Sequence, residues 1–259
     1  MGSTKRILVA LDSSPDSALS LGMATTLAAQ IEAQIETLFI EDVELVRLAG
    51  LPFAAEFDRL SGVESALNLA ELNHTLQKRA EKMRALVQSL SKDKNIYANF
   101  KVVRGHYIAE AMQREAEILF MMLPRYLPSS QGMRSSRYST LRKASDFTAP
   151  IYVYYSGGDE SKRAITLGAE LATMLGADLV VLLPSAQVAE VPALKQQLAS
   201  EPGKKSVRFE LVKTQISQCA MRVAQSGCTL FVLPKSSVAN DSINVQALRT
   251  VHCPLVLVA

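Results

Sequence analysis

Two short polar turns carry the residue types from which a binding site could be built. The first is Asp12-Ser13-Ser14-Pro15, which places a carboxylate after the apolar run Ile7–Leu11. The second is Ser156-Gly157-Gly158-Asp159-Glu160-Ser161, which follows Pro150–Tyr155. Glycines let the main chain approach an anion, and a turn that opens a helix adds N–H donors and a favourable dipole. The second turn is therefore a candidate anion site, formed by Ser156, Gly157, Gly158 and Ser161.

A basic segment offers another way to hold phosphate. This segment begins at Pro124 and contains no acidic residue before Asp146. It carries five basic side chains: Arg125, Arg134, Arg137, Arg142 and Lys143. Guanidinium groups match phosphate oxygens, so these side chains could replace the glycine amides of other phosphate sites. The alternative is a solvated surface loop, which is the commoner setting for a run of charges.

The histidines and cysteines form no recognisable catalytic or metal-binding set. His74, His106 and His252 lack the spacing of metal ligands and suggest no Ser/His/Asp triad. The three cysteines contain no Cys-x-x-Cys pair and leave an odd thiol. They are expected to be small buried apolar residues in a reducing compartment, without disulfides or metal. The sequence thus predicts no catalytic residue, no metal and no required cofactor.

The elements that position the two turns occur twice in the chain. Lys5–Ile40 and Ala149–Pro184 align without a gap at one offset, where Ile7 meets Ile151 and Ser17 meets Ser161. A period of this size indicates two copies of one domain. On this hypothesis the glycine-rich turn is either an anion site or a drifted copy of the first turn. The expected domains are 1–149 and a shorter, degenerate 150–259.

Strand and helix patterns alternate along the whole chain. The apolar runs Ile7–Leu11 and Ile35–Ile40 enclose Ser17–Ile31, whose helical spacing predicts a β-α-β unit with parallel strands. The alternation continues to Leu255–Val258, which indicates an α/β fold with parallel sheets. We count nine core strands, one fewer than two complete copies need. Because Ile151–Tyr155 resembles both an opening and a closing strand, the two domains are expected to be fused at it.

A long amphipathic helix is predicted from Val63 to about Leu90. Its apolar residues recur at spacings of three and four: Leu69, Leu72, Leu76, Ala80, Met83, Val87 and Leu90. Its length of roughly 40 Å is more than a five-stranded sheet requires. The apolar seam either faces another subunit, helped by Leu48–Phe57, or covers its own domain. In two other helices, Gly22 and Gly168 indicate close packing.

Composition limits the classes of partner. The chain has 259 residues, 48% of them apolar, and 28 basic residues balance 25 acidic ones. A net charge of +3 gives no general attraction to nucleic acid or membrane. No apolar run approaches the roughly 20 residues that span a bilayer, and MGSTKR lacks the apolar core of a signal peptide. A soluble, cytoplasmic protein is expected.

Three features together resemble the universal stress protein family. They are the opening ILVALDSSPDS, the strand end Val102-Val103-Arg104-Gly105, and the closing strands that begin with proline. The segment ELVRLAGLPF is similar to a loop of bacterial tandem members. The resemblance covers nearly the whole chain. It implies two Rossmann-like units of five parallel strands, arranged as a tandem pseudo-dimer, in a family that contains both nucleotide binders and non-binders.

Nucleotide binders of that family carry an aspartate after the first strand and, after the fourth, G-x-x-G, nine residues and G-[S/T]. Asp12 matches the aspartate, which the resemblance places against the ribose. The phosphate loop keeps this spacing, but its glycine positions fall on Pro124, Leu127 and Arg137. Proline has no N–H to donate, and the bulkier side chains keep a phosphate from approaching the main chain. The candidate nucleotide residues, for ATP or AMP, are Asp12, Ser13, Ile40, Arg125, Arg137 and Ser139.

The second half departs further from the binders. Ser156 replaces the aspartate, and the loop after Pro234 is shorter and has no glycine. Ser156–Ser161 is also similar to the S-G-G-x-D-S loop of PP-loop ATP pyrophosphatases, with Glu160 at the position of the aspartate. No basic or metal-binding residues downstream support adenylation.

The sequence therefore predicts a non-catalytic stress-response or adaptor protein. It would act through a protein partner or as a homodimer, with its ATP-binding motif degenerate in both halves. The main alternative is a sensor that binds an adenine nucleotide through Asp12 and the basic segment 125–143. A third and weaker alternative is an ATP-using enzyme at Ser156–Ser161.

Overall fold

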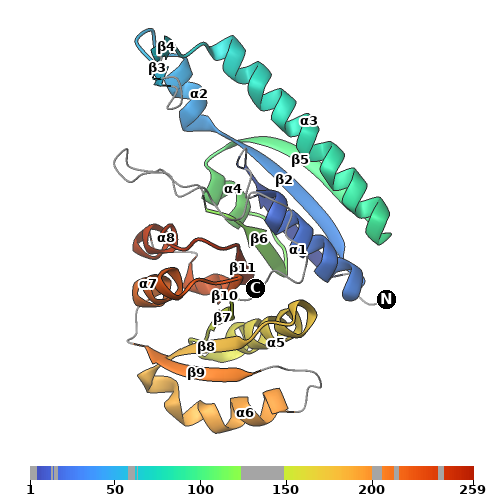
Figure 1. Ribbon diagram of the computed structural model, residues 1–259, viewed down its shortest axis with the longest axis vertical. Coiled ribbons are helices and arrows are strands. Elements are labelled where there is room, and N and C mark those ends of the chain that lie inside the picture. Colours follow the sequence, from blue (N-terminus) through green and yellow to red (C-terminus); the bar gives the residue numbers. More distant parts are fainter. Residues whose placement is uncertain are drawn as a thin grey trace. The chain divides into compact units, whose positions relative to one another are not determined.

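A computed structural model describes residues 5–12, 14, 17–57, 62, 64–123, 149–199, 206–212, 216–238 and 242–259. The chain divides into two compact units, Met1–Glu115 and Ala116–Ala259 (Figure 1). The expected domain boundary at 149/150 rests on the sequence repeat and stays a prediction. Among the described helices, none has both the length and the apolar character that a membrane span requires.

The first unit contains a parallel sheet of three strands. Its order is β5 (Ala98–Gly105), β2 (Gln34–Asp42) and β1 (Arg6–Leu11). Helix α1 (Ser17–Gln30) packs against β1 and β2, and α4 (Tyr107–Met112) packs against β2 and β5. These elements agree with the predicted β-α-β unit.

The long helix of the first unit is shorter at its start than the sequence predicts. A small antiparallel hairpin of β3 (Ala55–Phe57) and β4 (Glu64–Ala66) precedes it. Helix α3 therefore spans Leu69–Lys94, because Asn68 caps it by accepting a hydrogen bond from the Ala70 N–H at 2.8 Å. The apolar spacing that predicts a helix continues into the hairpin before Leu69. The Asn68 cap therefore sets the first residue of α3, and the spacing does not.

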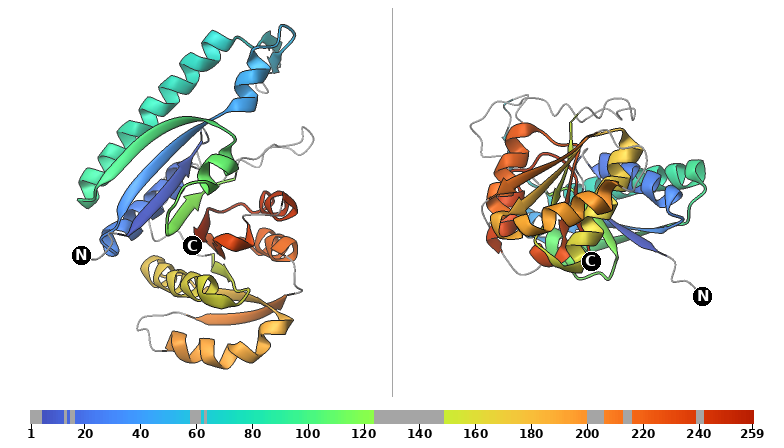
Figure 2. Two further views of the ribbon diagram at one scale, coloured as in Figure 1. Left: turned by 180° about the vertical axis from the view of Figure 1, so that it is seen from behind. Right: turned by 90° about the horizontal axis from the view of Figure 1, so that it is seen from below.

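The seam of α3 packs onto its own unit. The helix lies alongside β5 and α1 in both views of Figure 2, and Leu76, Ala80 and Val87 are buried. Leu69, at its first turn, is 39% exposed. Of the two alternatives for the seam, the structure favours cover for its own sheet. Other apolar side chains of this unit, on α2 (Val43–Ala49) and in the turn after it, are exposed to solvent.

The second unit contains a six-stranded sheet. Its order is β6 (Ile118–Met121), β11 (Leu255–Val258), β10 (Leu230–Pro234), β7 (Ile151–Tyr154), β8 (Leu179–Pro184) and β9 (Val207–Val212). Neighbouring strands are parallel except for β6 and β11, which are antiparallel. Every residue of β6, β7, β8, β10 and β11 is buried, as expected for strands covered on both faces. With β1, β2 and β5, the described residues hold the nine predicted core strands.

The helices of the second unit occupy the connections between its strands. Helix α5 (Gly158–Leu175) packs against β7, β8, β10 and β11. The chain continues through η2 (Ser185–Glu190), α6 (Val191–Ala199), α7 (Ile216–Ser226), η3 (Lys235–Ser237) and α8 (Ser242–Leu248). Helices α7 and α8 pack against each other (Figure 1). The helix predicted for Ser139–Asp146 lies outside the described residues.

The prediction that the two domains share Ile151–Tyr155 is wrong. Among the described strands, β7 pairs only with β8 and β10, which both belong to the second unit. The strand that meets β6 is β11, the last in the chain. Short buried strands have similar apolar sequences, so sequence similarity could not identify the hydrogen-bond partner.

The two predicted close-packing glycines differ. A Cβ on Gly168 would lie 2.3 Å from Val153 Cγ2, so the helix α5 needs glycine to approach β7. A Cβ on Gly22 would meet nothing within 4 Å. The prediction is therefore correct for Gly168 and wrong for Gly22, whose carbonyl instead accepts hydrogen bonds from Thr25 and Thr26.

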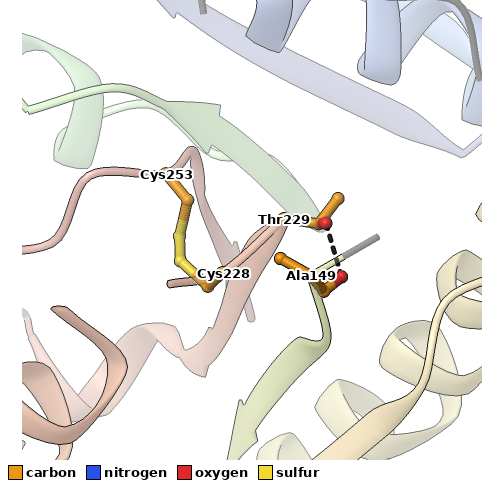
Figure 3. Close-up of a disulfide and its surroundings, with 4 residues drawn as sticks. All are labelled: Ala149, Cys228, Thr229 and Cys253. Atoms are coloured by element: carbon orange, nitrogen blue, oxygen red, sulfur yellow. Dashed lines mark hydrogen bonds between the residues drawn. A yellow bond between two sulfur atoms is a disulfide. The ribbon is translucent and has the colours of Figure 1, made fainter. Parts of the chain in front are cut away.

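The expectation that the cysteines form no disulfide is also wrong. Cys228 and Cys253 are joined by a disulfide (Figure 3). Cys219 is free and buried. The two bonded residues precede β10 and β11, which are adjacent strands, so the fold brings together cysteines that are 25 residues apart. Spacing in the sequence contains no sign of this pairing.

Candidate functional site at the ends of β1 and β7

The carboxylate of Asp12 lies just beyond β1 and is bonded within its own turn. Its Oδ1 accepts hydrogen bonds from the Ser14 N–H at 2.9 Å, the Ser14 hydroxyl and the Ser17 hydroxyl at 2.6 Å. The Asp12 N–H in turn donates to Ser17 Oγ at 3.0 Å. Asp12 therefore fixes the start of α1. Its other oxygen, Oδ2, accepts no hydrogen bond from the described residues, and the side chain is half-buried.

The other predicted nucleotide residues are not gathered around Asp12 by the described structure. Ile40 is buried in β2, with 3% of its surface exposed, so it contributes to the core. Ser13, Arg125, Arg137 and Ser139 lie outside the described residues. The phosphate part of the predicted site is therefore left as a sequence prediction.

Tyr107 is a residue near this edge that sequence reasoning missed. It is buried at the start of α4, and its hydroxyl donates a hydrogen bond to the Ala10 carbonyl at 2.8 Å. The carbonyl lies near the end of β1, two residues before Asp12. The only signal in the sequence was a tyrosine that opens a helix after the turn Gly105-His106.

The turn after β7 repeats the pattern of the turn after β1. The Ser156 N–H donates to Ser161 Oγ at 3.2 Å, and the two hydroxyl oxygens are also 3.2 Å apart. Gly157 and Gly158 have φ of +92° and +80°, which glycine adopts without strain. The Gln187 side chain donates to the Ser156 carbonyl at 3.4 Å. The two serines predicted to hold an anion are thus bonded to each other.

Glu160 connects this turn to the loop after β10. Its Oε2 accepts a hydrogen bond from the Ser236 N–H at 3.1 Å. Strands β7 and β10 are parallel neighbours, so the turns that follow them meet at the carboxyl edge of the sheet. In α/β sheets this edge is where anionic ligands meet backbone N–H groups. Here a side-chain carboxylate already holds the Ser236 N–H.

A buried tyrosine links the end of β7 to the segment after β8. The Tyr155 hydroxyl donates a hydrogen bond to Glu190 Oε2, and its side chain is fully buried. Burial, and then the neighbouring carboxylate, raise the pKa of Tyr155 to about 12. The phenol is therefore neutral at ordinary pH and serves as a donor to Glu190.

The described residues contain no cluster of metal-binding side chains. No group of three or more His, Cys, Asp or Glu side chains in that part of the chain could hold a metal ion. His106 is exposed, and its Nε2 lies 3.8 Å from Glu44 Oε1 on the surface.

The turn after β7 presents a carboxylate on the side where a nucleotide phosphate would approach the Ser236 N–H. A phosphate there would meet the Glu160 carboxylate, a like charge, and would have to displace it from the Ser236 N–H.

Comparison with solved structures gives the fold a name. A universal stress protein from Archaeoglobus fulgidus DSM 4304 matches with a TM-score of 0.53 and 11% identity, covering 98% of this chain and 95% of that one. This chain has the universal stress protein fold. A structure from Pseudomonas aeruginosa UCBPP-PA14, whose description also names a universal stress protein, has a TM-score of 0.47 and 12% identity, covering 99% of this chain and 93% of its own. No family model and no curated protein sequence matches.

At this identity the likeness to universal stress proteins concerns the fold alone. It confirms the α/β class and the resemblance that the opening strand, the Val-Val-Arg-Gly strand end and the closing strands indicated. Function has to be argued from the residues at the carboxyl edges of β1 and β7.

Proposed function

We propose that this chain is a non-catalytic stress-response or adaptor protein of the universal stress protein type, with a nucleotide site that is degenerate in both halves. The hydrogen bond from the Ser236 N–H to Glu160 supports this most directly. At the edge where a phosphate would bind, the protein supplies its own anion. The Ser156–Ser161 pair supports the same conclusion, since its polar groups are already bonded.

We also infer that the two halves are diverged copies of one unit. The strand orders β5-β2-β1 and β9-β8-β7 correspond. The register agrees as well, because Ile7 pairs with Ile35 and Ile151 pairs with Leu179 at the same sequence offset. The hydrogen bond between Asp12 N and Ser17 Oγ has its counterpart between Ser156 N and Ser161 Oγ. Divergence at the turns then explains how a site could be lost while the fold is kept.

Action through protein contacts is supported by an apolar surface on the first unit, which we call the apolar tip. It comprises exposed side chains on α2 (Val43–Ala49), the turn after it and the start of α3: Leu45, Leu48, Leu51, Phe53 and Leu69. Phe53 is 80% exposed and Leu48 is 52% exposed. A hydrogen bond of 2.8 Å from the Leu67 N–H to the Ala54 carbonyl brings the turn beside the start of α3. Clustered exposed apolar residues of this kind are typical of protein-binding surfaces.

Calorimetric titration of the purified chain with ATP and magnesium tests the loss of the nucleotide site. We expect no saturable heat, no nucleotide released when a sample is unfolded, and no AMP or pyrophosphate after incubation. Micromolar affinity or co-purified nucleotide would overturn the proposal. Formation of AMP and pyrophosphate would favour an ATP-using enzyme instead.

A nucleotide sensor is the second candidate, and one observation favours it. Asp12 stays half-buried at the carboxyl edge of β1, with no described donor to its Oδ2. That oxygen could accept a hydrogen bond from a ribose hydroxyl, while the basic segment 125–143 held the phosphates. If titration shows binding, its loss in both Asp12→Ala and Arg137→Ala would establish this sensor. Binding that survives both substitutions would contradict it.

The apolar tip is tested by replacing Leu48 and Phe53 together with serine. Both side chains are exposed, so the free energy of unfolding should change by less than about 0.5 kcal/mol. Self-association in sedimentation equilibrium, or cross-linking to a partner protein in cells, should weaken at least about tenfold. A double variant that associates and cross-links like the wild type would show that the tip is not a binding surface.

A further inference from the structure

The disulfide between Cys228 and Cys253 lies at the amino ends of two neighbouring strands. Cys228 comes just before β10, and Cys253 comes just before β11, with their Cα atoms 5.9 Å apart. The parallel register pairs Phe231 with Leu255, so the bond continues the ladder of the two strands. It closes a covalent loop that contains all of β10, α8 and the connections between them.

The residue next to Cys228 anchors the same point to a third strand. Thr229 donates a hydrogen bond from Oγ1 to the Ala149 carbonyl at 2.6 Å (Figure 3). Its N–H donates to the Pro150 carbonyl at 3.0 Å. Ala149 and Pro150 lead directly into β7. The disulfide therefore lies where the starts of β7, β10 and β11 meet.

The far end of the same covalent loop reaches the candidate site. Ser236, whose N–H binds Glu160, lies in η3 between the two cysteines. The connection from β10 to β11 is thus held at the amino edge by the disulfide and at the carboxyl edge by Glu160. Loss of the disulfide removes the covalent attachment at the amino edge.

We propose that Cys228 and Cys253 form a reversible disulfide whose oxidation state sets the rigidity of the β10–α8–β11 segment. A disulfide restricts the open and unfolded conformations of the loop that it closes. In an intracellular protein such a bond is typically transient and redox-sensing. The inference does not depend on whether a nucleotide binds.

The oxidant in this proposal is a low-molecular-weight disulfide such as glutathione disulfide. The thiolate of one cysteine attacks it, forms a mixed disulfide and releases one small thiolate. The thiolate of the second cysteine then attacks the protein sulfur of the mixed disulfide and releases the other. The protein loses two protons and two electrons, and the oxidant becomes two thiols.

Burial determines how this exchange can occur. Cys228 and Cys253 are only 3% and 1% exposed, so either sulfur becomes accessible when the strand ends open locally. Cys219 is a matched internal control in α7, because it is free and fully buried. Burial also raises the pKa of its thiol to about 12, which keeps it protonated and unreactive.

The pairing is tested by equilibrating the full chain in glutathione buffers of graded ratio, quenching with acid, and alkylating the thiols after unfolding. Mass spectrometry should show Cys228 and Cys253 protected together in oxidising buffer and alkylated together in reducing buffer. Cys219 should be alkylated in both. A chain that shows three alkylated thiols at every ratio would overturn the proposal, and so would a disulfide that no excess of reduced glutathione opens.

The mechanical effect is tested by hydrogen exchange and thermal melting of the oxidised and reduced wild type. Reduction should speed exchange in peptides from 235–251 by about tenfold while α1 stays unchanged, and lower Tm by about 5–10 °C. Cys228→Ala/Cys253→Ala should match the reduced protein in both buffers, and Cys219→Ala should respond like the wild type. Because the wild type alone supplies both states, a misfolded variant does not affect the test. Equal exchange and equal Tm in the two states would sink the proposal.

Discussion

Polar side chains after β7 take one another as partners. Ser156 bonds to Ser161, Glu160 to the Ser236 N–H, and Tyr155 to Glu190. Each of these groups is of a type that could bind a ligand, which is why the sequence marks the turn as a candidate site. In the structure, each of these groups has a hydrogen-bond partner inside the protein.

The first prediction at this scale concerns the pH dependence of stability through Tyr155. Its pKa of about 12 in the folded protein exceeds the ordinary value of 10.0, so the unfolded chain loses this proton first. The stabilisation is fully present below pH 10 and is lost as pH rises through 12. Between pH 10 and pH 12, deprotonation of Tyr155 should lower the free energy of unfolding of the wild type by an amount on the order of 2 kcal/mol. Tyr155→Phe should lack this decrease when its unfolding in urea is measured over the same pH range. An unchanged pH slope in the variant would contradict the assignment.

A second prediction concerns the Glu160 carboxylate. In Glu160→Ala the Ser236 N–H loses its acceptor, and its exchange with solvent should accelerate by about fivefold, the effect of one hydrogen bond of about 1 kcal/mol. Glu160→Gln keeps an uncharged acceptor, so its exchange rate at Ser236 should lie between those of the wild type and Glu160→Ala. Asp159→Ala is the control, because the Asp159 side chain is 86% exposed and lies beside Glu160 in the sequence. If the Asp159 and Glu160 variants protect Ser236 equally, the hydrogen bond is not formed in solution.

At the scale of elements, α3 shows how far a periodic pattern can be interpreted. The seam residues repeat as predicted, and those in the middle of the helix are buried on the sheet. The first seam residue of the helix, Leu69, is however 39% exposed and is not part of this buried contact. Periodicity identifies the apolar side of a helix, while the packing partners, here α1 and β5, are set by the tertiary structure.

The α3 contact predicts opposite results for two leucines of the same seam. Leu76 is 2% exposed, and Leu76→Ala should lower the free energy of unfolding by about 2–4 kcal/mol. Leu69 is 39% exposed at the first turn, so Leu69→Ala should change the free energy of unfolding by less than about 0.5 kcal/mol. Urea unfolding of the two variants measures the difference. Equal losses would mean that the seam is covered along its whole length, as an interface with another subunit would require.

At the scale of the whole molecule, the order of strands departs from the order of the sequence. β6 precedes the repeat boundary of the sequence, yet it pairs with β11 at the end of the chain. The pairs include Phe120 with Val256 and Leu119 with Leu257. A compact unit therefore begins at Ala116, well before the second copy of the sequence pattern.

This pairing predicts that a change in β6 weakens the C-terminal strands. Phe120 is fully buried, and Phe120→Ala should destabilise the second unit by about 3–5 kcal/mol. Hydrogen exchange should then lose protection in β10 and β11. Leu48→Ala, at an exposed position of the first unit, is the control and should leave β10 and β11 protected. Intact protection in the Phe120 variant would show that β6 is not part of this sheet.

The sequence by itself determined the alternation of strands and helices, the repeated Ile7–Leu11 and Ile151–Tyr154 strands, and the two serine-containing turns. These features depend on local hydrophobic periodicity and on turn residues, which act over a few positions. The resemblance to universal stress proteins also places the glycine positions of the phosphate loop on Pro124, Leu127 and Arg137, and this assignment stays a prediction.

Only the tertiary structure decided the pairing of β6 with β11, the disulfide between Cys228 and Cys253, and the capture of the Ser236 N–H by Glu160. Each joins residues that are far apart in the chain, from 25 positions for the disulfide to more than a hundred for the strands. Such contacts depend on which buried surfaces fit together in space. The residues alone indicated where a site could form, and the fold determined that its polar groups bind one another.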